Sequence, residues 1–336
     1  MKKIVTFGEI LARFSTDQGQ RLSKSNQLTL HYGGAEANVA VSLAQLGHQT
    51  AFASKVPNNH LGQGIIQYLK AMNVATDLVQ LGGERLGTYY LEVGAGNRGS
   101  QVIYDRKHSS FSQTVEHDWD FDALLSDTSI LHVTGITPAL SESLIKMVEA
   151  LFKRAQTLNV KVSFDCNYRG KLWSQEQAGT VLRRLLPYVN ICSCGELDMV
   201  YLFNYAQQPD HLTYKDKLYN YYRLLTDDYP NIEYLLSTKR ENLSASHNRL
   251  TGYLYTNNEI YQSRIFDIDH IIDRVGGGDA FVAGTLHGII KDWNPDAIVS
   301  FATAASVLKH TIKGDANLVS EEEIKSQMSS ENQISR

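Results

Sequence analysis

The chain has 336 residues, 43% of them hydrophobic, and its 32 basic and 36 acidic side chains give a net charge of −4. This apolar fraction excludes disorder as the main state, and the near-neutral charge argues against a polybasic nucleic-acid-binding protein. Since no uncharged apolar stretch reaches roughly 18 residues, we expect no membrane span. Three cysteines make no disulfide framework, and a glycine and an acid appear too early for a signal peptide, so we expect a cytoplasmic protein.

Short apolar runs and amphipathic segments alternate along most of the chain. The expected strands are 4–8, 50–56, 130–133, 160–164, 191–193 and 234–237. The expected helices are 34–47, 62–72, 141–157, 175–186 and 216–227. This alternation predicts an α/β fold with a mostly parallel sheet covered by helices.

Two stretches, 11–32 and 85–114, contain no good helix pattern. The second reads as a β-hairpin with a long polar loop, since Thr88–Val93 and Ser100–Arg106 flank a turn rich in Gly, Asn and Arg. We therefore predict a small β-sheet lid. The expected division is an α/β core of residues 1–10, 33–84 and 115–325, a lid of residues 11–32 and 85–114, and a polar tail of residues 326–336.

The strongest chemical signal is the segment Asp273-Arg274-Val275-Gly276-Gly277-Gly278-Asp279-Ala280-Phe281, which runs into an apolar helical pattern. A glycine turn at a helix N-terminus leaves backbone amides free to hold an anion. Asp279 beside such amides is either a helix N-cap or a base that accepts a hydroxyl proton. The three glycines and the upstream Asp273 favour the base.

This segment resembles the C-terminal signature of the ribokinase-like (PfkB) carbohydrate kinases, and Gly33-Gly34-Ala35-Glu36-Ala37-Asn38-Val39-Ala40 resembles the N-terminal one. The resemblance spans residues 3–320. It implies a three-layer α/β/α domain with a small β lid, and ATP and Mg²⁺ as cofactors. Exposed strands in a lid favour pairing with another copy of the chain, so we expect a homodimer through the lid, with a higher assembly as the alternative. The resemblance also implies that Asp279 is the catalytic base and that the amides of Gly276, Gly277 and Gly278 hold the transferring phosphoryl group.

Within this family, four segments resemble the kinases of 2-keto-3-deoxygluconate: Gly87–Glu92, Val102–Arg106, Asp165–Arg169 and Lys313–Asp315. The resemblance implies a sugar-acid site built from Gly33, Gly34, Asn38, Tyr89, Tyr104, Arg106, Asn167, Arg169, Asp279 and Asp315. Tyr104 and Arg106 are two apart on a strand and so share a face, and arginine suits a carboxylate. A solvated hairpin charge for Arg106 and a surface arginine for Arg169 remain open.

The nucleotide site is less clearly marked. The resemblance implies that Ser237, Lys239, Gly276, Gly278, Ala304 and Val307 contact ATP, although Lys239 and Asn242 stand where relatives have glycines. Glu196 is the expected magnesium residue, acting through water, with an ordinary surface glutamate as the alternative. Some relatives hold a monovalent cation, and Asp273 with nearby carbonyl groups is the candidate for it here.

The expected reaction is ATP-dependent phosphorylation of the C6 hydroxyl of 2-keto-3-deoxygluconate. The partners are then the small sugar acid and ATP, with no nucleic acid and no membrane. A kinase of a neutral sugar, such as fructose or ribose, is the first alternative. A sugar sensor without activity is the second. Cys192 and Cys194 have no further Cys or His cluster beside them, so we do not expect a zinc site.

Overall fold

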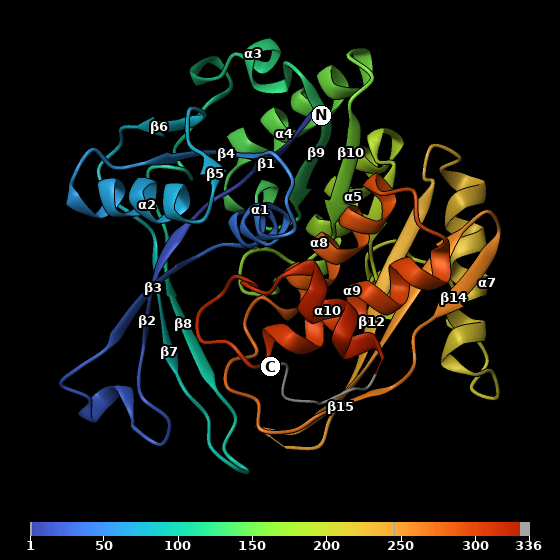
Figure 1. Cartoon of the computed structure of the whole chain (residues 1–336). Coiled ribbons are helices and arrows are strands. Elements are labelled where there is room, and N and C mark those ends of the chain that lie inside the picture. Colours follow the sequence, from blue (N-terminus) through green and yellow to red (C-terminus); the bar gives the residue numbers. More distant parts are fainter. Residues whose placement is uncertain (1, 245, 330–336) are drawn as a thin grey trace.

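The structure is a computed structural model that describes residues 2–244 and 246–329. Its larger sheet follows the order β14-β13-β12-β11-β10-β9-β1-β4-β5, with β15 beside β13 and β6 beside β4 (Figure 1). The strands are β1 (Lys3–Phe7), β4 (Thr50–Val56), β5 (Val74–Ala75), β6 (Val79–Leu81), β9 (Thr128–Thr134), β10 (Lys161–Asp165), β11 (Ile191–Ser193), β12 (Tyr234–Asn242), β13 (Asn248–Thr256), β14 (Glu259–Gln262) and β15 (Phe266–Ile268). All pairs from β5 to β12 are parallel, which confirms the predicted mostly parallel sheet.

The second sheet is smaller and separate, and it projects from the body at the lower left of Figure 1. Its order is β3-β2-β7-β8, built from β2 (Leu11–Ser15), β3 (Thr29–Gly33), β7 (Thr88–Glu92) and β8 (Gln101–Asp105). These strands come from the two stretches that lack a helical pattern. The predicted small sheet is therefore present, and we call it the lid sheet.

Helices cover both faces of the larger sheet because successive strand residues point to opposite sides. On β1, Ile4 packs with α1 (Ala35–Gln45), α8 (Gly277–Ile290) and α9 (Pro295–Lys309). Its neighbour Val5 packs with the helices of the other face, which are α4 (Glu142–Thr157), α5 (Gln175–Leu185) and α7 (Tyr214–Asp228). The remaining helices are α2 (His60–Ala71), α3 (Phe121–Leu125), α6 (Glu196–Tyr201) and α10 (Glu321–Met328). This is the three-layer α/β/α arrangement that the resemblance implied.

The edge beyond β11 differs from the sequence prediction. The strand expected at 234–237 continues to Asn242 as β12, and β13 pairs with it antiparallel. The turn from β13 to β14 contains Asn257 and Asn258, both with positive φ, at 52° and 61°. Two adjacent left-handed asparagines are a mark of a two-residue hairpin, so a signal for this edge was present in the sequence.

The C-terminal segment also differs, since helix α10 extends to Met328 and therefore includes residues 326–328 of the expected polar tail. Ser320 caps this helix by accepting a hydrogen bond from the backbone amide of Glu323, and Ile324 is buried. A cap and one buried apolar residue stabilise this short helix in spite of its polar composition. Residues 330–336 of the expected tail lie outside the described residues.

The chain reverses its direction of sheet growth at β1, because β4 joins one side of β1 and β9 joins the other. Ligands of open α/β sheets bind outside the carboxyl ends of strands near such a point. Within residues 2–244 and 246–329, no helix combines the length and the apolar character that crossing a membrane requires.

Candidate active site

The glycine turn before α8 forms the base of the candidate site. Gly276 has a φ of 83°, and a Cβ at this position would lie 1.7 Å from the carbonyl oxygen of Asp315. Only glycine fits such a left-handed position against another backbone. A Cβ at Gly278 would meet nothing within 4 Å, so this side of the turn is open. The first amides of α8 are thus accessible to an anion.

Asp279 lies in the first turn of α8, but it is not the helix cap. Gly276 occupies the N-cap position, and no side chain caps the helix. The carboxylate of Asp279 instead accepts a hydrogen bond from Asn38 Nδ2 at 2.7 Å. Burial raises the pKa of Asp279 to about 6, while the bond from Asn38 and the charge of Arg169 act in the opposite direction. At neutral pH the group is therefore ionised and close to the range of an effective general base.

Two more carboxylates follow the ends of neighbouring strands. Burial raises the pKa of Asp165, at the end of β10, to about 7, and the charges of Asp279 and Asp198 add to this rise. Burial also raises the pKa of Asp198, in the first turn of α6, to about 6. The sequence analysis did not identify either residue as a metal ligand. Carboxylate oxygens are the donors that a hard divalent cation such as Mg²⁺ prefers, and one oxygen of Asp198 accepts a hydrogen bond from the backbone amide of Gly195 at 2.8 Å.

The expected magnesium residue, Glu196, is the first residue of α6 and is half-buried. Its carboxylate is 3.8 Å from Lys217 Nζ, an ion pair that a surface glutamate also makes. Glu196 lies two positions before Asp198, whose charge is among the causes that raise the pKa of Asp165.

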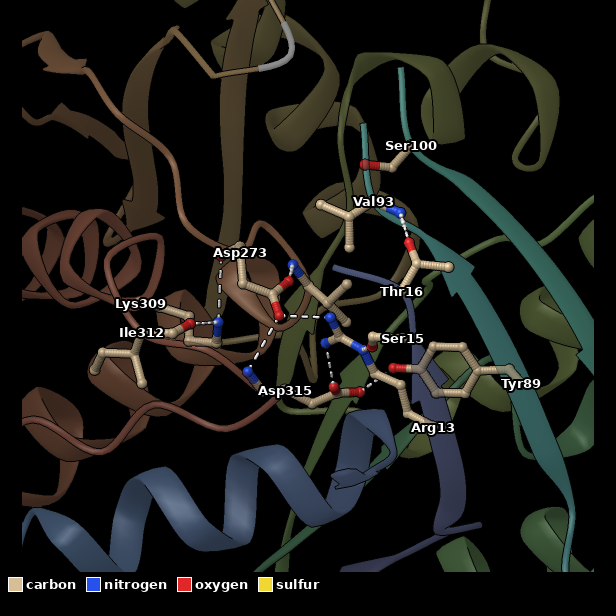
Figure 2. A network of polar contacts seen from close by, with 12 residues as sticks. Arg13, Ser15, Thr16, Tyr89, Val93, Ser100, Asp273, Lys309, Ile312 and Asp315 are labelled. Carbon is tan, nitrogen blue, oxygen red and sulfur yellow. Dashed lines mark hydrogen bonds and ion pairs between the residues drawn. The ribbon is translucent and has the colours of Figure 1, made fainter. Parts of the chain in front are cut away.

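An arginine of the lid sheet joins it to the core loops. Arg13 on β2 is buried, and its guanidinium lies 2.6 Å from Asp273 Oδ2 and 2.7 Å from Asp315 Oδ1 (Figure 2). Tyr89 on β7 donates its hydroxyl hydrogen to the other oxygen of Asp315. Asp315 was expected to contact sugar hydroxyls, but the structure places both of its oxygens on lid residues. Sequence analysis missed Arg13, because its partners Asp273 and Asp315 lie 260 and 302 positions away and no local pattern marks the ion pair.

Arg106 has an internal carboxylate partner. Its Nε lies 2.7 Å from Glu9 Oε2, and Ser109 donates to the other Glu9 oxygen. Arg106 is 9% exposed and Glu9 is 4% exposed, so this pair is buried. The structure therefore excludes the alternative that Arg106 is a solvent-exposed charge of the hairpin. Arg106 thus already neutralises a carboxylate of the chain itself. The Arg106 guanidinium also lies 5.7 Å from the centre of the Tyr104 ring.

Arg169 is placed differently. It follows β10 and is exposed, and among the described residues its guanidinium has no hydrogen bond or ion pair, although its backbone carbonyl accepts one from Leu172. Its positive charge lowers the pKa of both Asp165 and Asp279, so it is within electrostatic reach of these two carboxylates. Next to it, Asn167 has a φ of 37° and donates its amide hydrogen to Asp165 Oδ1 at 3.2 Å.

The two glycines at the end of β3 make room for the residues around the site. A Cβ at Gly33 would lie 2.1 Å from Asp315 Oδ2, and one at Gly34 would lie 2.1 Å from the carbonyl oxygen of Glu9. The amide of Gly34 donates to Asn38 Oδ1 at 3.4 Å, which directs the other end of this side chain to Asp279. These glycines therefore allow the end of β3 to pack closely against Asp315 and against the connection between β1 and β2.

The expected nucleotide residues lie on three elements, with Ser237 and Lys239 on β12, Gly276 and Gly278 at the start of α8, and Ala304 and Val307 on α9. Ala304 is fully buried and Val307 is 6% exposed, and both pack with Phe301 in an apolar cluster. Ala304 therefore belongs to the core, which corrects the expectation that it forms an adenine wall. Ser237 is buried with its Oγ 2.8 Å from the Tyr222 hydroxyl.

Lys239 lies within strand β12, opposite Thr251, and not in a loop after the strand. Its Nζ is 5.1 Å from the centre of the Tyr214 ring and 3.7 Å from Glu241 Oε1. A regular strand thus stands where relatives have a glycine-containing loop, because the backbone of these residues pairs with β13.

The sequence and the fold of the chain are similar to those of known proteins. A family model described as pfkB family carbohydrate kinase matches residues 1–219. A 2-dehydro-3-deoxygalactonokinase of Haloferax volcanii is 29% identical over 322 residues, covering 96% of this chain and 95% of the relative. A crystal structure of a PfkB family carbohydrate kinase from Listeria grayi is 45% identical, with a TM-score of 0.93 and coverage of 98% of this chain and 100% of that one. The 2-dehydro-3-deoxygluconokinase structure from Thermotoga maritima is 36% identical, with a TM-score of 0.94 and 98% coverage of both chains.

Proposed function

Because the chain belongs to the pfkB family of carbohydrate kinases, we propose that it transfers a phosphoryl group from ATP to the C6 hydroxyl of 2-keto-3-deoxygluconate. The observation that carries this proposal is the geometry of Asp279. A half-buried carboxylate with a raised pKa lies next to the open amides of a glycine turn, and its side-chain partner is Asn38. A base and an anion-binding turn in one place suit phosphoryl transfer to a hydroxyl group.

In this mechanism Asp279 accepts a hydrogen bond from the C6 hydroxyl and takes its proton as the bond to phosphorus forms. Phosphoryl transfer has a loose transition state, so a carboxylate with a pKa of about 6 is basic enough. The amides of Gly276, Gly277 and Gly278 stabilise negative charge on the transferred group. The lid sheet, held to the core by Arg13, limits the access of water.

PfkB carbohydrate kinases use ATP with Mg²⁺, which neutralises charge on the nucleotide phosphates. In this chain Asp165 and Asp198 are the carboxylates that would hold the metal, with Glu196 acting through water. Gly276 and Gly278 would face the phosphates, and Ser237, Lys239 and Val307 remain candidates for contacts with the rest of the nucleotide.

The proposal that the substrate is a sugar acid rests on Arg169. Arg106 is already paired with Glu9, so Arg169 is the guanidinium left to bind a substrate carboxylate. Asn38, Asn167 and the exposed Tyr104 are the candidates for the sugar hydroxyls. The galacto epimer of this acid, 2-keto-3-deoxygalactonate, is a second candidate substrate, because the relative from Haloferax volcanii is named a 2-dehydro-3-deoxygalactonokinase.

The dimer belongs to the same proposal. Among the described residues, no strand pairs with the outer edges of β3 and β8 in the lid sheet. These two strands expose Leu30, Ile103 and Tyr104 at 41%, 55% and 43%. Unpaired strand edges with apolar side chains favour pairing with a second copy. We therefore propose a homodimer through the lid sheet, acting in the cytoplasm where ATP is available. Light scattering on Ile103→Lys tests it: a monomer is expected, and an unchanged mass contradicts the interface.

A coupled ADP-release assay tests the function. The panel contains 2-keto-3-deoxygluconate, its galacto epimer, gluconate, fructose and ribose, each with ATP and Mg²⁺. We expect the highest kcat/KM for a keto-deoxy acid and a product phosphorylated at C6. A higher kcat/KM for fructose or ribose would show that the substrate is a neutral sugar.

A further inference from the structure

Lys309, the last residue of α9, has a fully buried side chain. Lysine is almost never buried unless its ammonium group finds partners. Here Nζ donates hydrogen bonds to the carbonyl oxygens of Asp273, at 3.3 Å, and Ile312, at 3.1 Å (Figure 2). Both partners are backbone oxygens, which can only accept, so the pocket around Nζ suits a cation.

The two carbonyl groups belong to the two loops that form the glycine turn and its support. Asp273 begins the segment that leads to Gly276, and Ile312 begins the loop that contains Gly314 and Asp315. The loops also touch directly, since the amide of Gly314 donates to Asp273 Oδ2 at 3.1 Å. A Cβ at Gly276 would lie 3.4 Å from Lys309 Cε, so the lysine stem lies directly behind the turn.

The charges around Lys309 explain why a cation is stable there. Burial lowers the pKa of Lys309, and the negative charges of Asp273, Asp315 and Asp279 oppose that change, whereas Arg13 adds to it. Arg13 neutralises the carboxylates of Asp273 and Asp315 from the lid side. Lys309 approaches the same loops from the core side and donates hydrogen bonds to two carbonyl oxygens that Arg13 does not contact.

We infer that Lys309 is a built-in cation that positions the anion-binding glycine turn, so that turnover requires no dissociable monovalent cation. Its ammonium group occupies the place where a potassium or ammonium ion would bridge the same two carbonyl oxygens. Lys309 is a positioning residue, since it acts through the backbone of the turn. The inference rests on the proposed function, because it assigns the turn a role in phosphoryl transfer.

The test uses Lys309→Ala, which removes the ammonium group and leaves space between the two carbonyl oxygens. Activity is measured at constant ionic strength in tetramethylammonium, lithium, potassium or ammonium chloride. For the unmodified protein we expect the same kcat in all four salts. For Lys309→Ala in tetramethylammonium chloride we expect kcat to fall about 100-fold with little change in KM, as for a displaced catalytic group. Potassium or ammonium ions, but not lithium, are expected to restore at least a tenth of the lost activity.

A second measurement does not depend on the substrate. Potassium or ammonium chloride should raise the Tm of Lys309→Ala relative to tetramethylammonium chloride, and should leave the Tm of the unmodified protein unchanged. If the protein phosphorylates no acid in the panel, the proposed function fails while this measurement still tests the cation site. Lys291→Ala, which removes an exposed lysine at the end of α8, is the matched control and should respond to no salt.

Three results would overturn the inference: potassium stimulation of the unmodified protein, a normal kcat for Lys309→Ala in every salt, or an equal response of Lys291→Ala. If Lys309→Ala does not fold, Lys309→Met takes its place, because its side chain fills the pocket without charge. A reduced kcat that no salt restores, with KM unchanged, then supports the inference. A normal kcat for Lys309→Met refutes it.

Discussion

Asn38 Nδ2 donates a hydrogen bond to Asp279 Oδ2 at 2.7 Å, and the two residues are 241 positions apart in the chain. The bond connects the first helix, α1, with the first turn of α8. It holds the carboxylate of Asp279 beside the glycine turn and leaves the amides of the turn open to an anion. The side chain that orients the proposed base thus comes from the other signature segment of the chain.

Asp279→Asn should abolish turnover and keep the sugar bound. The amide cannot accept the hydroxyl proton, so we expect kcat to fall by roughly 1,000-fold or more. The size and the hydrogen-bonding positions of the side chain are nearly kept, so calorimetric binding of the sugar acid should change little. A kcat within tenfold of the unmodified protein would remove Asp279 from the role of base.

The decrease of kcat/KM at low pH, which is the acid limb of the pH profile, should reflect the protonation of Asp279. Burial raises its pKa to about 6, and the base must be ionised, so kcat/KM should fall as the pH drops below this value. Asn38→Ala removes a hydrogen bond that favours the ionised form, so the limb should move to higher pH. Asn167→Ala is the matched control, because the side-chain amide of Asn167 donates to Asp165 Oδ2 and not to Asp279. If the acid-side decrease of kcat/KM shifts in Asp165→Asn but not in Asn38→Ala, the group that titrates is Asp165 and not Asp279.

Two substitutions separate the fold of the glycine turn from its function. Gly276→Ala forces alanine into a φ of 83° and against the carbonyl of Asp315, so it should destabilise the fold by roughly 2 kcal/mol or more. Gly278→Ala meets no atom within 4 Å and should leave the stability nearly unchanged. Its methyl group enters the open side of the turn, so kcat should fall by roughly 100-fold. Equal effects of both substitutions on urea unfolding would contradict this distinction.

Arg169→Ala should raise KM for the sugar acid by about 100-fold, the loss expected for a charged hydrogen bond. The methyl ester of the same acid lacks the negative charge, so its KM should change less than threefold between the two proteins, by the same reasoning. Lys171→Ala removes an exposed cation of the same loop and serves as the control. An equal rise of KM for acid and ester would mean that Arg169 does not recognise the carboxylate.

Arg106→Met should reduce stability because it leaves the buried carboxylate of Glu9 without its cation. Breaking a buried ion pair in this way costs about 3–5 kcal/mol. The double variant Arg106→Met/Glu9→Gln removes both charges and should recover most of this loss in urea unfolding. If the single variant is as stable as the unmodified protein, the pair does not hold the lid sheet to the core.

The sequence was sufficient for the layered fold, because alternating apolar runs and amphipathic helices can only be buried on a covered sheet. It failed at the β12–β13 edge, where Arg240 and Asn242 look like loop residues but belong to a strand paired with Leu250 and Asn248. Strand pairing provides hydrogen bonds for the backbone N–H and C=O groups of these residues, whatever the polarity of their side chains. The expectation for Ala304 failed for a related reason, since helical spacing alone does not tell which face of α9 packs into the core.

By itself the sequence determined the glycine turn and its acid, since three glycines and Asp279 act through local backbone geometry. It did not determine the partners of the charged residues. Arg106 pairs with Glu9 across 97 positions, and Arg13 pairs with Asp315 across 302. No spacing rule links such residues, because only the folded chain brings them together and excludes the water that would otherwise solvate them. The tertiary structure therefore decided which arginine remains available to a substrate.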